Sequence, residues 1–284
     1  MFDQIREYGE EQDMRNLRVI FNDGQPGASA ARNLGIGQAK GDIIAFLDDD
    51  AVAYSDWAEK TMQTYSDESV VGVTGPAFPL WQSKPAAWFP EEFYWILSCT
   101  SWTSYGGPTE VRNIWLQNGS FRREAFELAG VLDAHLGPND SIEGFKGREF
   151  KTGMVADDVE LSLRVKKATQ KRILFNPETR VKHRVDPRRL KLAYVARWSY
   201  WLGYSKHRLK RLHPDKGSDV LNQERGLLRR IATKLVPSMI VGAFSHPIQT
   251  GRKLLVTATA LSCVSAGYLA AFYPLQRRPK ATSR

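Results

Sequence analysis

The chain has 284 residues, of which 42% are hydrophobic and 25% are charged. This length allows one large domain or one domain with an appendage, and the composition excludes a largely disordered chain and a membrane protein with many spans. The two cysteines, Cys99 and Cys263, belong to no CxxC or Cys/His cluster, so neither a zinc site nor a disulfide framework is expected.

Charge is divided unevenly along the chain. Residues 1–150 contain 12 Lys/Arg and 23 Asp/Glu, a net charge of −11, whereas residues 151–284 contain 28 and 8, a net charge of +20. A basic segment can face nucleic acid, anionic lipid or a phosphorylated substrate. The N-terminal residues are charged and lack an apolar signal-peptide core, so we expect this part of the chain to stay in the cytoplasm.

The first half of the chain alternates strand and helix patterns. We expect a strand at residues 17–21, a helix at 28–39 and a second strand at 43–47. The second strand is a continuous apolar run, typical of a parallel strand covered by helices on both faces. Ser55 is the expected N-cap of the next helix, and residues 70–74 form another strand. The predicted fold class is therefore α/β, built on a strand–helix–strand unit.

Residues 76–108 interrupt this alternation with five prolines and many aromatic residues. We interpret the segment as an irregular, partly buried wall or lid. Its aromatic side chains either fill a core or stack against a substrate, and both roles are open. The residues concerned are Trp81, Trp88, Phe89, Phe93, Tyr94, Trp95 and Trp102.

The basic second half has features expected at a membrane. Residues 190–212 interleave Arg and Lys with aromatic residues, a pattern typical of a helix in a lipid headgroup layer or of a nucleic-acid-binding segment. Residues 254–275 are uncharged and long enough to cross a hydrocarbon core of roughly 30 Å. Their Ser, Thr and small residues also suit a buried or interfacial helix. Residues 235–250 are apolar but shorter, which suits a hairpin or re-entrant arrangement.

Three consecutive aspartates, Asp48, Asp49 and Asp50, directly follow the strand at 43–47. Like charges at the end of a buried strand repel one another, and a Mg²⁺ or Mn²⁺ ion relieves the repulsion and can bridge carboxylates to substrate phosphates. Ligands of open α/β sheets also bind at the carboxyl ends of strands. The alternative is a solvated acidic turn.

Two later motifs add titratable groups. Asp157 and Asp158 begin an amphipathic helix, where one of them can serve as a general base for an attacking hydroxyl or where both are only favourable partners of the helix dipole. His183 follows a strand-like segment and is either structural or a further metal ligand.

Taken together and in this order, these segments resemble family 2 glycosyltransferases of the GT-A fold, a Rossmann-like mixed sheet flanked by helices. The donor-binding segment of that family is similar to ARNLGIGQAKGDIIAFLDDDAV, its acceptor-side strand and helix to NGSFRREAFELAG, and its base motif to ADDVELSLRV. Within the family, FPEEFYWILSCT and VRNIWLQNGSFRR most resemble archaeal-type transferases that add glucuronic acid to glucosyl-dolichyl phosphate. The resemblance covers roughly residues 17–190.

The resemblance implies a role for each matching residue. Asp48 and Asp50 are the implied ligands of the metal and the diphosphate, and His183 is a further metal ligand. Asp49 is implied to line the site of the nucleotide and its ribose. Asp158 is the implied base with Asp157 as its alternative, Arg32 orients the donor, and Asn118 lines the acceptor pocket. The implied cofactor is Mn²⁺ or Mg²⁺. The implied reaction inverts the anomeric carbon.

The implied organisation has two parts. A catalytic domain at 1–190 lacks the family's two opening strands and begins instead with a charged, helix-like segment at 3–14, so we expect an N-terminally truncated domain. Residues 191–284 supply basic, aromatic interfacial helices and a transmembrane helix near 254–275. The expected partners are a UDP-sugar, a polyprenyl- or dolichyl-phosphate-linked acceptor and an anionic membrane surface, without nucleic acid. The expected location is a membrane, with the catalytic domain on the cytoplasmic face.

Two other functions fit parts of the sequence. IIAFLDDDAV also suits haloacid-dehalogenase-like phosphatases, in which Asp48 is the nucleophile, Asp50 the acid/base, and Lys151 with the later acidic pair completes the site. The other alternative is a non-catalytic, membrane-associated remnant that keeps the fold without the donor site.

Overall fold

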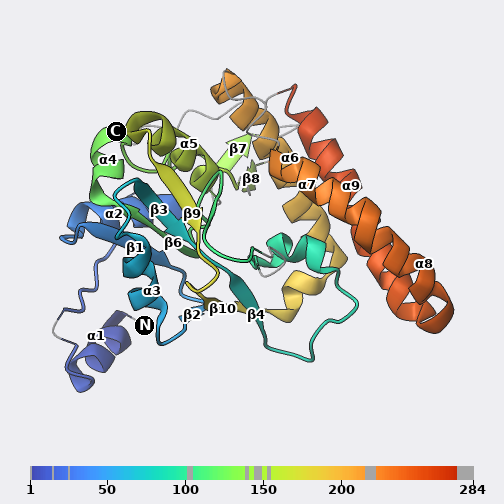
Figure 1. Ribbon diagram of the computed structural model, residues 1–284, viewed down its shortest axis with the longest axis horizontal. Helices are drawn as coiled ribbons and strands as arrows, with labels where there is room; N and C mark the ends of the chain where they lie inside the picture. Colours follow the sequence, from blue (N-terminus) through green and yellow to red (C-terminus); the bar gives the residue numbers. More distant parts are fainter. Residues whose placement is uncertain are drawn as a thin grey trace.

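A computed structural model describes residues 2–14, 16–24, 26–100, 105–137, 141–143, 149–151, 155–214 and 222–273 (Figure 1). Its largest sheet, among these residues, has five strands in the order β1-β6-β3-β9-β5. Only β3 and β9 are parallel to each other, and the other pairs are antiparallel. The strands are β1 (Ile43–Leu47), β3 (Val70–Thr74), β5 (Thr109–Glu110), β6 (Asn118–Arg122) and β9 (Arg172–Phe175).

Three helices cover one face of this sheet: α2 (Ala28–Gln38), α4 (Arg123–Ala129) and α5 (Asp157–Thr169). The core between them contains apolar side chains such as Phe46, Phe121 and Leu161. A smaller apolar cluster on the sheet's other side contains Tyr65, Val70 and Leu174. Its Tyr65 directly follows α3 (Trp57–Thr64) in the chain. The central strand β3 is buried at all five positions, including the polar Thr74. The mixed α/β sheet flanked by helices is thus confirmed.

A second sheet of three described strands, in the order β2-β10-β4, extends this domain. Its strands are β2 (Ala51–Ala53), β4 (Ala77–Trp81) and β10 (Val181–Val185). Along β10 buried residues alternate with exposed ones, so that His183 points inward between Val181 and Val185. A separate hairpin joins β7 (Ser141–Glu143) to β8 (Glu149–Lys151).

Three expectations from the sequence are wrong in detail. Residues 17–21 form no strand, and Phe21 is 72% exposed. Strand β1 is not parallel and not covered on both faces, since its partner β6 is antiparallel and Leu47 is 44% exposed. The helix after Ser55 begins at Trp57 with Asp56 at the N-cap.

The aromatic segment at 76–108 mainly fills a core. It forms β4 and the 3₁₀ helix η1 (Glu91–Leu97), and Phe89 and Phe93 are buried against helices from the C-terminal part. Trp81, Trp88 and Tyr94 pack on the same cluster, and Trp95 also faces a cavity described below. Trp102 lies outside the described residues.

The remaining described elements are helical. A short helix α1 (Phe2–Glu11) opens the chain, and η3 (Pro187–Leu190) leads into the long helix α6 (Leu192–Leu212). In Figure 1, α7 (Asn222–Arg230), the π-helical turn η6 (Ile231–Leu235) and α8 (Val236–Ser245) follow one another, and α9 (Pro247–Ala270) turns back beside them. These helices lie beside the sheet domain, and α8 lies far from the sheet.

Two glycines allow α6 and α9 to pack backbone against backbone. A Cβ atom at Gly203 would lie 1.9 Å from the Val264 carbonyl oxygen, and one at Gly267 would lie 1.9 Å from the Tyr200 carbonyl oxygen. Farther along, the His207 ring contacts Tyr268 and Phe272, with ring centroids 5.0 and 4.3 Å apart. The two helices therefore run side by side in the same direction.

Replacing Gly203 with alanine is expected to lower the free energy of unfolding by about 2–3 kcal/mol, because the new methyl group meets backbone atoms that cannot rotate away. Chemical denaturation followed by circular dichroism measures the change. Gly251→Ala, within α9, is the control, since nothing lies within 4 Å of its Cβ position. This control should be neutral or stabilising by up to about 1 kcal/mol. Equal stability of both variants would contradict the close packing of α6 on α9.

Candidate functional site

The turn after β1 places the aspartate cluster next to β10. The Ala51 N–H donates to the Asp48 carbonyl at 3.0 Å, and the chain then enters β2. Strand β2 pairs with β10 so that Ala51 lies opposite His183, and the Arg184 N–H donates to the Asp50 carbonyl at 2.8 Å. This pairing brings His183 beside Asp50, 133 residues earlier in the chain.

Asp48, Asp50 and His183 form a group able to hold a cation. One ligand atom from each residue lies within 4.8 Å of the others, and His183 Nε2 is 2.9 Å from Asp50 Oδ1. Octahedral Mg²⁺ with bonds of about 2.1 Å separates neighbouring ligands by about 3 Å and opposite ligands by about 4 Å. The 4.8 Å limit is somewhat wider than these separations, so a small inward shift of the side chains would let the three residues hold such an ion, and two carboxylates with one imidazole suit Mn²⁺ at least as well.

The burial of His183 supports a ligand role. Its side chain is 1% exposed, and its Nδ1 atom has no hydrogen-bond partner among the described residues. Its Nε2 lies 2.9 Å from the Asp50 carboxylate. A buried imidazole held in this way presents one nitrogen to the acidic cluster.

Two arginines neutralise the cluster in the structure. Arg189 Nη2 lies 3.0 Å from Asp50 Oδ2, and Arg32 Nη2 lies 2.7 Å from Asp48 Oδ1. Burial opposes ionisation of Asp50, but the hydrogen bond and charge of His183 and the charge of Arg189 outweigh it, so the pKa of Asp50 is lowered. Asp50 is thus an anion across the physiological pH range.

Two further carboxylates begin α5. Asp157 accepts a hydrogen bond from Ser29 Oγ at 2.6 Å, and Arg32 Nη1 lies 3.7 Å from it. Burial raises the pKa of Asp157 against the opposing effects of Ser29 and Arg32. Burial and the neighbouring charge of Asp157 raise the pKa of Asp158 to about 7. One carboxyl of the pair therefore changes charge near neutral pH, as a general base requires.

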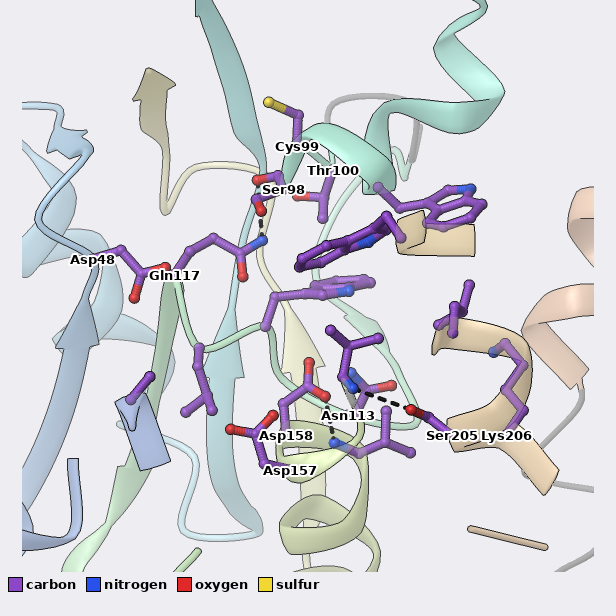
Figure 2. A pocket seen from close by; sticks show the side chains of 18 of the residues that line it. Asp48, Ser98, Cys99, Thr100, Asn113, Gln117, Asp157, Asp158, Ser205 and Lys206 are labelled. Carbon is purple, nitrogen blue, oxygen red and sulfur yellow. Dashed lines mark hydrogen bonds between the residues drawn. The ribbon is translucent and has the colours of Figure 1, made fainter. Parts of the chain in front are cut away.

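A cavity of about 370 Å³ is lined by Asp48 of the first group and by both carboxylates of the second (Figure 2), whereas Asp50 and His183 lie outside its lining. Asp48 enters it from the sheet, and Asp157 and Asp158 lie at the start of α5. Arg32 bridges the two acidic groups, since its guanidinium contacts Asp48 and Asp157. Most of the other lining residues are apolar or aromatic, with cations among them: Trp95, Trp115, Trp198, Leu202, Leu209, Leu227, Arg112 and Lys206.

The other predicted site residues lie elsewhere. Asp49 is exposed and is not part of the cavity lining. Asn118 is 1% exposed and also lies outside the lining. Its side-chain oxygen accepts from Trp57 Nε1 at 2.8 Å, and its amide nitrogen donates to the Thr179 and Pro76 carbonyls at 2.7 and 3.2 Å. These bonds use the amide to join β6 to the second sheet, so the structure gives Asn118 a supporting position.

Two residues of the site escaped the sequence analysis. Arg189 follows β10 by four residues, and Asp186 holds this short turn by accepting from the Arg188 N–H at 2.7 Å. Ser29 lies one helical turn before Arg32 on α2 and so faces the same carboxylate. The two consecutive arginines Arg188 and Arg189, which follow the strand of His183, could have indicated a cationic side chain near the acidic cluster. Nothing in the sequence singled out Ser29.

Comparison with known proteins places these residues in a family context. Residues 3–128 match the family model described as glycosyl transferase family 2. The chain is 30% identical over 220 residues to the glucosyl-dolichyl phosphate glucuronosyltransferase of Haloferax volcanii, which is 77% of this chain and 66% of that relative. It is 27% identical over 183 residues to the succinoglycan biosynthesis protein ExoM of Rhizobium meliloti, which is 64% of this chain and 52% of that relative.

A solved structure of GalNAc-T7 with UDP, GalNAc and Mn²⁺ aligns with a TM-score of 0.47 and 14% identity, over 76% of this chain and 46% of that one. The chain spans no more than 66% of the length of these proteins. The matched family segment contains α2, β1 and the aspartate cluster, and the longer similarity to the Haloferax volcanii protein supports the same assignment. The chain belongs to glycosyl transferase family 2.

Proposed function

We propose that the chain transfers a sugar from a nucleoside-diphosphate sugar to a lipid-linked acceptor, with inversion at the anomeric carbon. The observation that carries the proposal is the double contact of Arg32, which joins the metal-competent group to the Asp157–Asp158 pair in one cavity. A donor diphosphate and an acceptor hydroxyl need these two kinds of group next to each other.

Each group has a proposed part in the transfer. Asp48, Asp50 and His183 hold Mn²⁺ or Mg²⁺, which when bound neutralises the leaving diphosphate. Arg32 orients the donor beside Asp48, and Asp49 remains a proposed contact to the nucleotide. Asp158 takes the proton from the attacking hydroxyl, because its pKa of about 7 lets it be a base at neutral pH.

Asp157 is less suited to that step. Its carboxylate is engaged by Ser29 and lies near Arg32. Among the described residues the structure gives the Asp158 carboxylate one hydrogen bond, from the Val159 N–H at 2.7 Å. We therefore assign the base to Asp158 and a supporting role to Asp157, whose charge raises the pKa of its neighbour.

The aromatic residues of the cavity lining support a lipid-phosphate acceptor. Indole rings offer stacking surfaces to sugars and apolar contact to a polyprenyl chain, and Arg112 and Lys206 offer charge to its phosphate. The relative named glucosyl-dolichyl phosphate glucuronosyltransferase supports a dolichyl-phosphate-linked sugar as acceptor and glucuronic acid as the transferred sugar. Asn118, which lies outside the lining, remains a proposed acceptor-side residue that acts by holding β6.

Such an acceptor resides in a bilayer, so we also propose that the chain works on the cytoplasmic face of a membrane and assembles glycans for lipid or protein. Among the described residues, α9 is the helix long and apolar enough to cross a membrane, with a mean hydropathy of 1.4 over its most apolar window. The net charge of +20 in residues 151–284 favours an anionic surface.

The function is tested by incubating the chain with UDP-, GDP- and dTDP-sugars, Mn²⁺ and polyprenyl-phosphate-linked acceptors. We expect lipid-linked product to form from a UDP-sugar, with UDP-glucuronic acid as the first donor to examine, and to disappear when EDTA removes the metal. Membership of family 2 argues against the phosphatase alternative, and the side chain of Lys151 lies outside the described residues. Release of phosphate without sugar transfer would contradict the proposal. Inertness toward every donor would favour the non-catalytic remnant.

A further inference from the structure

We infer that α8 and α9 form an in-plane membrane-docking surface, so that α9 lies along the lipid headgroup layer instead of crossing the bilayer. The inference deepens the membrane location proposed above and does not depend on the transfer reaction. Three observations support it: α6 covers one side of α9, the helical hairpin formed by α8 and α9 exposes apolar side chains, and the sequence around these side chains is basic.

The packing of α6 on α9 opposes a spanning helix. Buried residues of α9 recur along one face, at Val256, Ala260 and Gly267, and this face meets α6. The contact is close because both backbones approach through glycines, as described above. A bilayer-spanning α9 would keep α6 beside it inside the hydrocarbon.

Helix α6 cannot enter hydrocarbon without a large penalty. Between residues 192 and 212 it carries the cations Arg197, Lys206, Arg208, Lys210 and Arg211. Charged side chains are rare in the bilayer core because no water solvates them there. One face of α6 also lines the catalytic cavity, through Trp198, Leu202 and Lys206. The helix thus belongs to the catalytic body, and α9 is attached along that body.

The opposite side of the hairpin is apolar and exposed. At the bend between α8 and α9, the exposed fractions are 62% for Ile240, 72% for Val241, 89% for Phe244 and 74% for Ile248. We call these four residues the hairpin tip. In Figure 1 the tip, at the α8 end of the hairpin, lies away from the sheet. Large apolar side chains gathered at an exposed bend mark a docking surface, since isolated ones are ordinary but a cluster is not.

Charge identifies the occupant as an anionic lipid surface. After Glu224 the sequence contains no Asp or Glu, whereas the elements that lead into α8 carry Arg225, Arg229 and Lys234, and α9 itself carries Arg252 and Lys253. Cations around an apolar patch pair with lipid phosphates while the apolar side chains enter the headgroup–acyl boundary. A second copy of the chain would bring the same cations together, so charge complementarity favours lipid over self-association.

The arrangement would hold the cavity at the level of the lipid headgroups. Helix α6 separates α9 from the cavity, and one helix is about 10 Å across. A lipid-linked acceptor in the same leaflet would then reach the Trp198 end of the cavity without leaving the membrane.

Flotation of the full chain with lipid vesicles tests the docking. We expect binding to phosphatidylcholine vesicles that contain 30% phosphatidylglycerol, weaker binding to pure phosphatidylcholine, and at least a tenfold loss of binding for the double variant Ile240→Glu/Phe244→Glu. Leu128→Glu is the matched control, because Leu128 is 61% exposed on α4. It should bind as the unmodified chain does.

Labelling with a membrane-impermeant maleimide separates docking from spanning. Gln249→Cys and Tyr273→Cys, each with Cys263→Ser, mark the two ends of the α9 region in sealed membrane vesicles from expressing cells. Equal labelling from the same side supports an in-plane helix, and labelling from opposite sides overturns it. The inference would also be overturned if the double variant floated with vesicles as well as the unmodified chain does. The same holds if the unmodified chain were a dimer and the double variant became a monomer without any change in flotation. None of these measurements requires turnover, so failed docking and failed catalysis remain distinguishable.

Discussion

Replacing Asp50 with alanine is expected to abolish metal-dependent transfer, with kcat/KM reduced on the order of 10³-fold or more, which corresponds to about 4 kcal/mol of transition-state stabilisation. The variant loses one proposed metal ligand and also the partner that holds His183 Nε2 and Arg189 in place. Steady-state kinetics with a UDP-sugar and a Mn²⁺ titration measure the loss. Binding of Mn²⁺ by calorimetry should weaken in parallel, which gives a readout independent of turnover.

The fold should survive this change. The Asp50 side chain is 29% exposed, so losing its ion pair with Arg189 costs little stability, while leaving the buried His183 Nε2 unpaired costs about 1–3 kcal/mol. Asp56→Ala is the matched control, because Asp56 is 31% exposed, pairs with Arg180 at 2.9 Å and does not line the cavity. That variant should keep its Mn²⁺ affinity and its turnover. Unchanged turnover or Mn²⁺ affinity in Asp50→Ala would contradict the metal assignment.

Elements whose signals are local were predictable from the sequence. The strand at 43–47 and the strand at 70–74 have their predicted bounds, and α5 begins at Asp157 as its acidic first turn indicates. Residues 17–21 have a similar apolar pattern but form no strand. A strand needs a hydrogen-bonding neighbour, and a window of residues does not show whether one exists.

Features that depend on register could not be predicted without the resemblance. The approach of His183 to Asp50 comes from the pairing of β2 with β10, and composition does not encode this pairing. The contacts of Ser29 with Asp157 and of Arg189 with Asp50 likewise join segments far apart in the sequence. The contacts of Asn118, which its motif predicts as an acceptor-side residue, are also long-range, since its amide bonds to Trp57 of α3 and to Thr179 before β10.

Replacing Asp158 with asparagine is expected to lower kcat by about 10²–10⁴-fold, the usual contribution of a general base, with a much smaller effect on KM. Asparagine keeps the shape of the side chain but cannot take the proton. In the unmodified chain kcat should fall about tenfold per pH unit below about pH 7, because the base must be ionised and its pKa is about 7. Asp157→Asn should move this fall in kcat to lower pH, since the substitution removes a charge that raises the pKa of Asp158.

Stability provides the independent check on Asp158, because its pKa is raised from 3.8 to about 7 in the folded chain. The folded state therefore holds this proton more tightly than the unfolded state does, and ionisation of Asp158 opposes folding as pH rises through this interval. Relative to the unmodified chain, Asp158→Asn should be more stable at pH 8 than at pH 5, as urea denaturation at the two values would show. If the Asn variant gains stability at pH 8 and loses kcat, Asp158 is the working base of the unmodified chain, and its ionisation there lowers the free energy of unfolding. A variant that loses both equally at each pH would instead make Asp158 a structural residue and leave the proton transfer to Asp157.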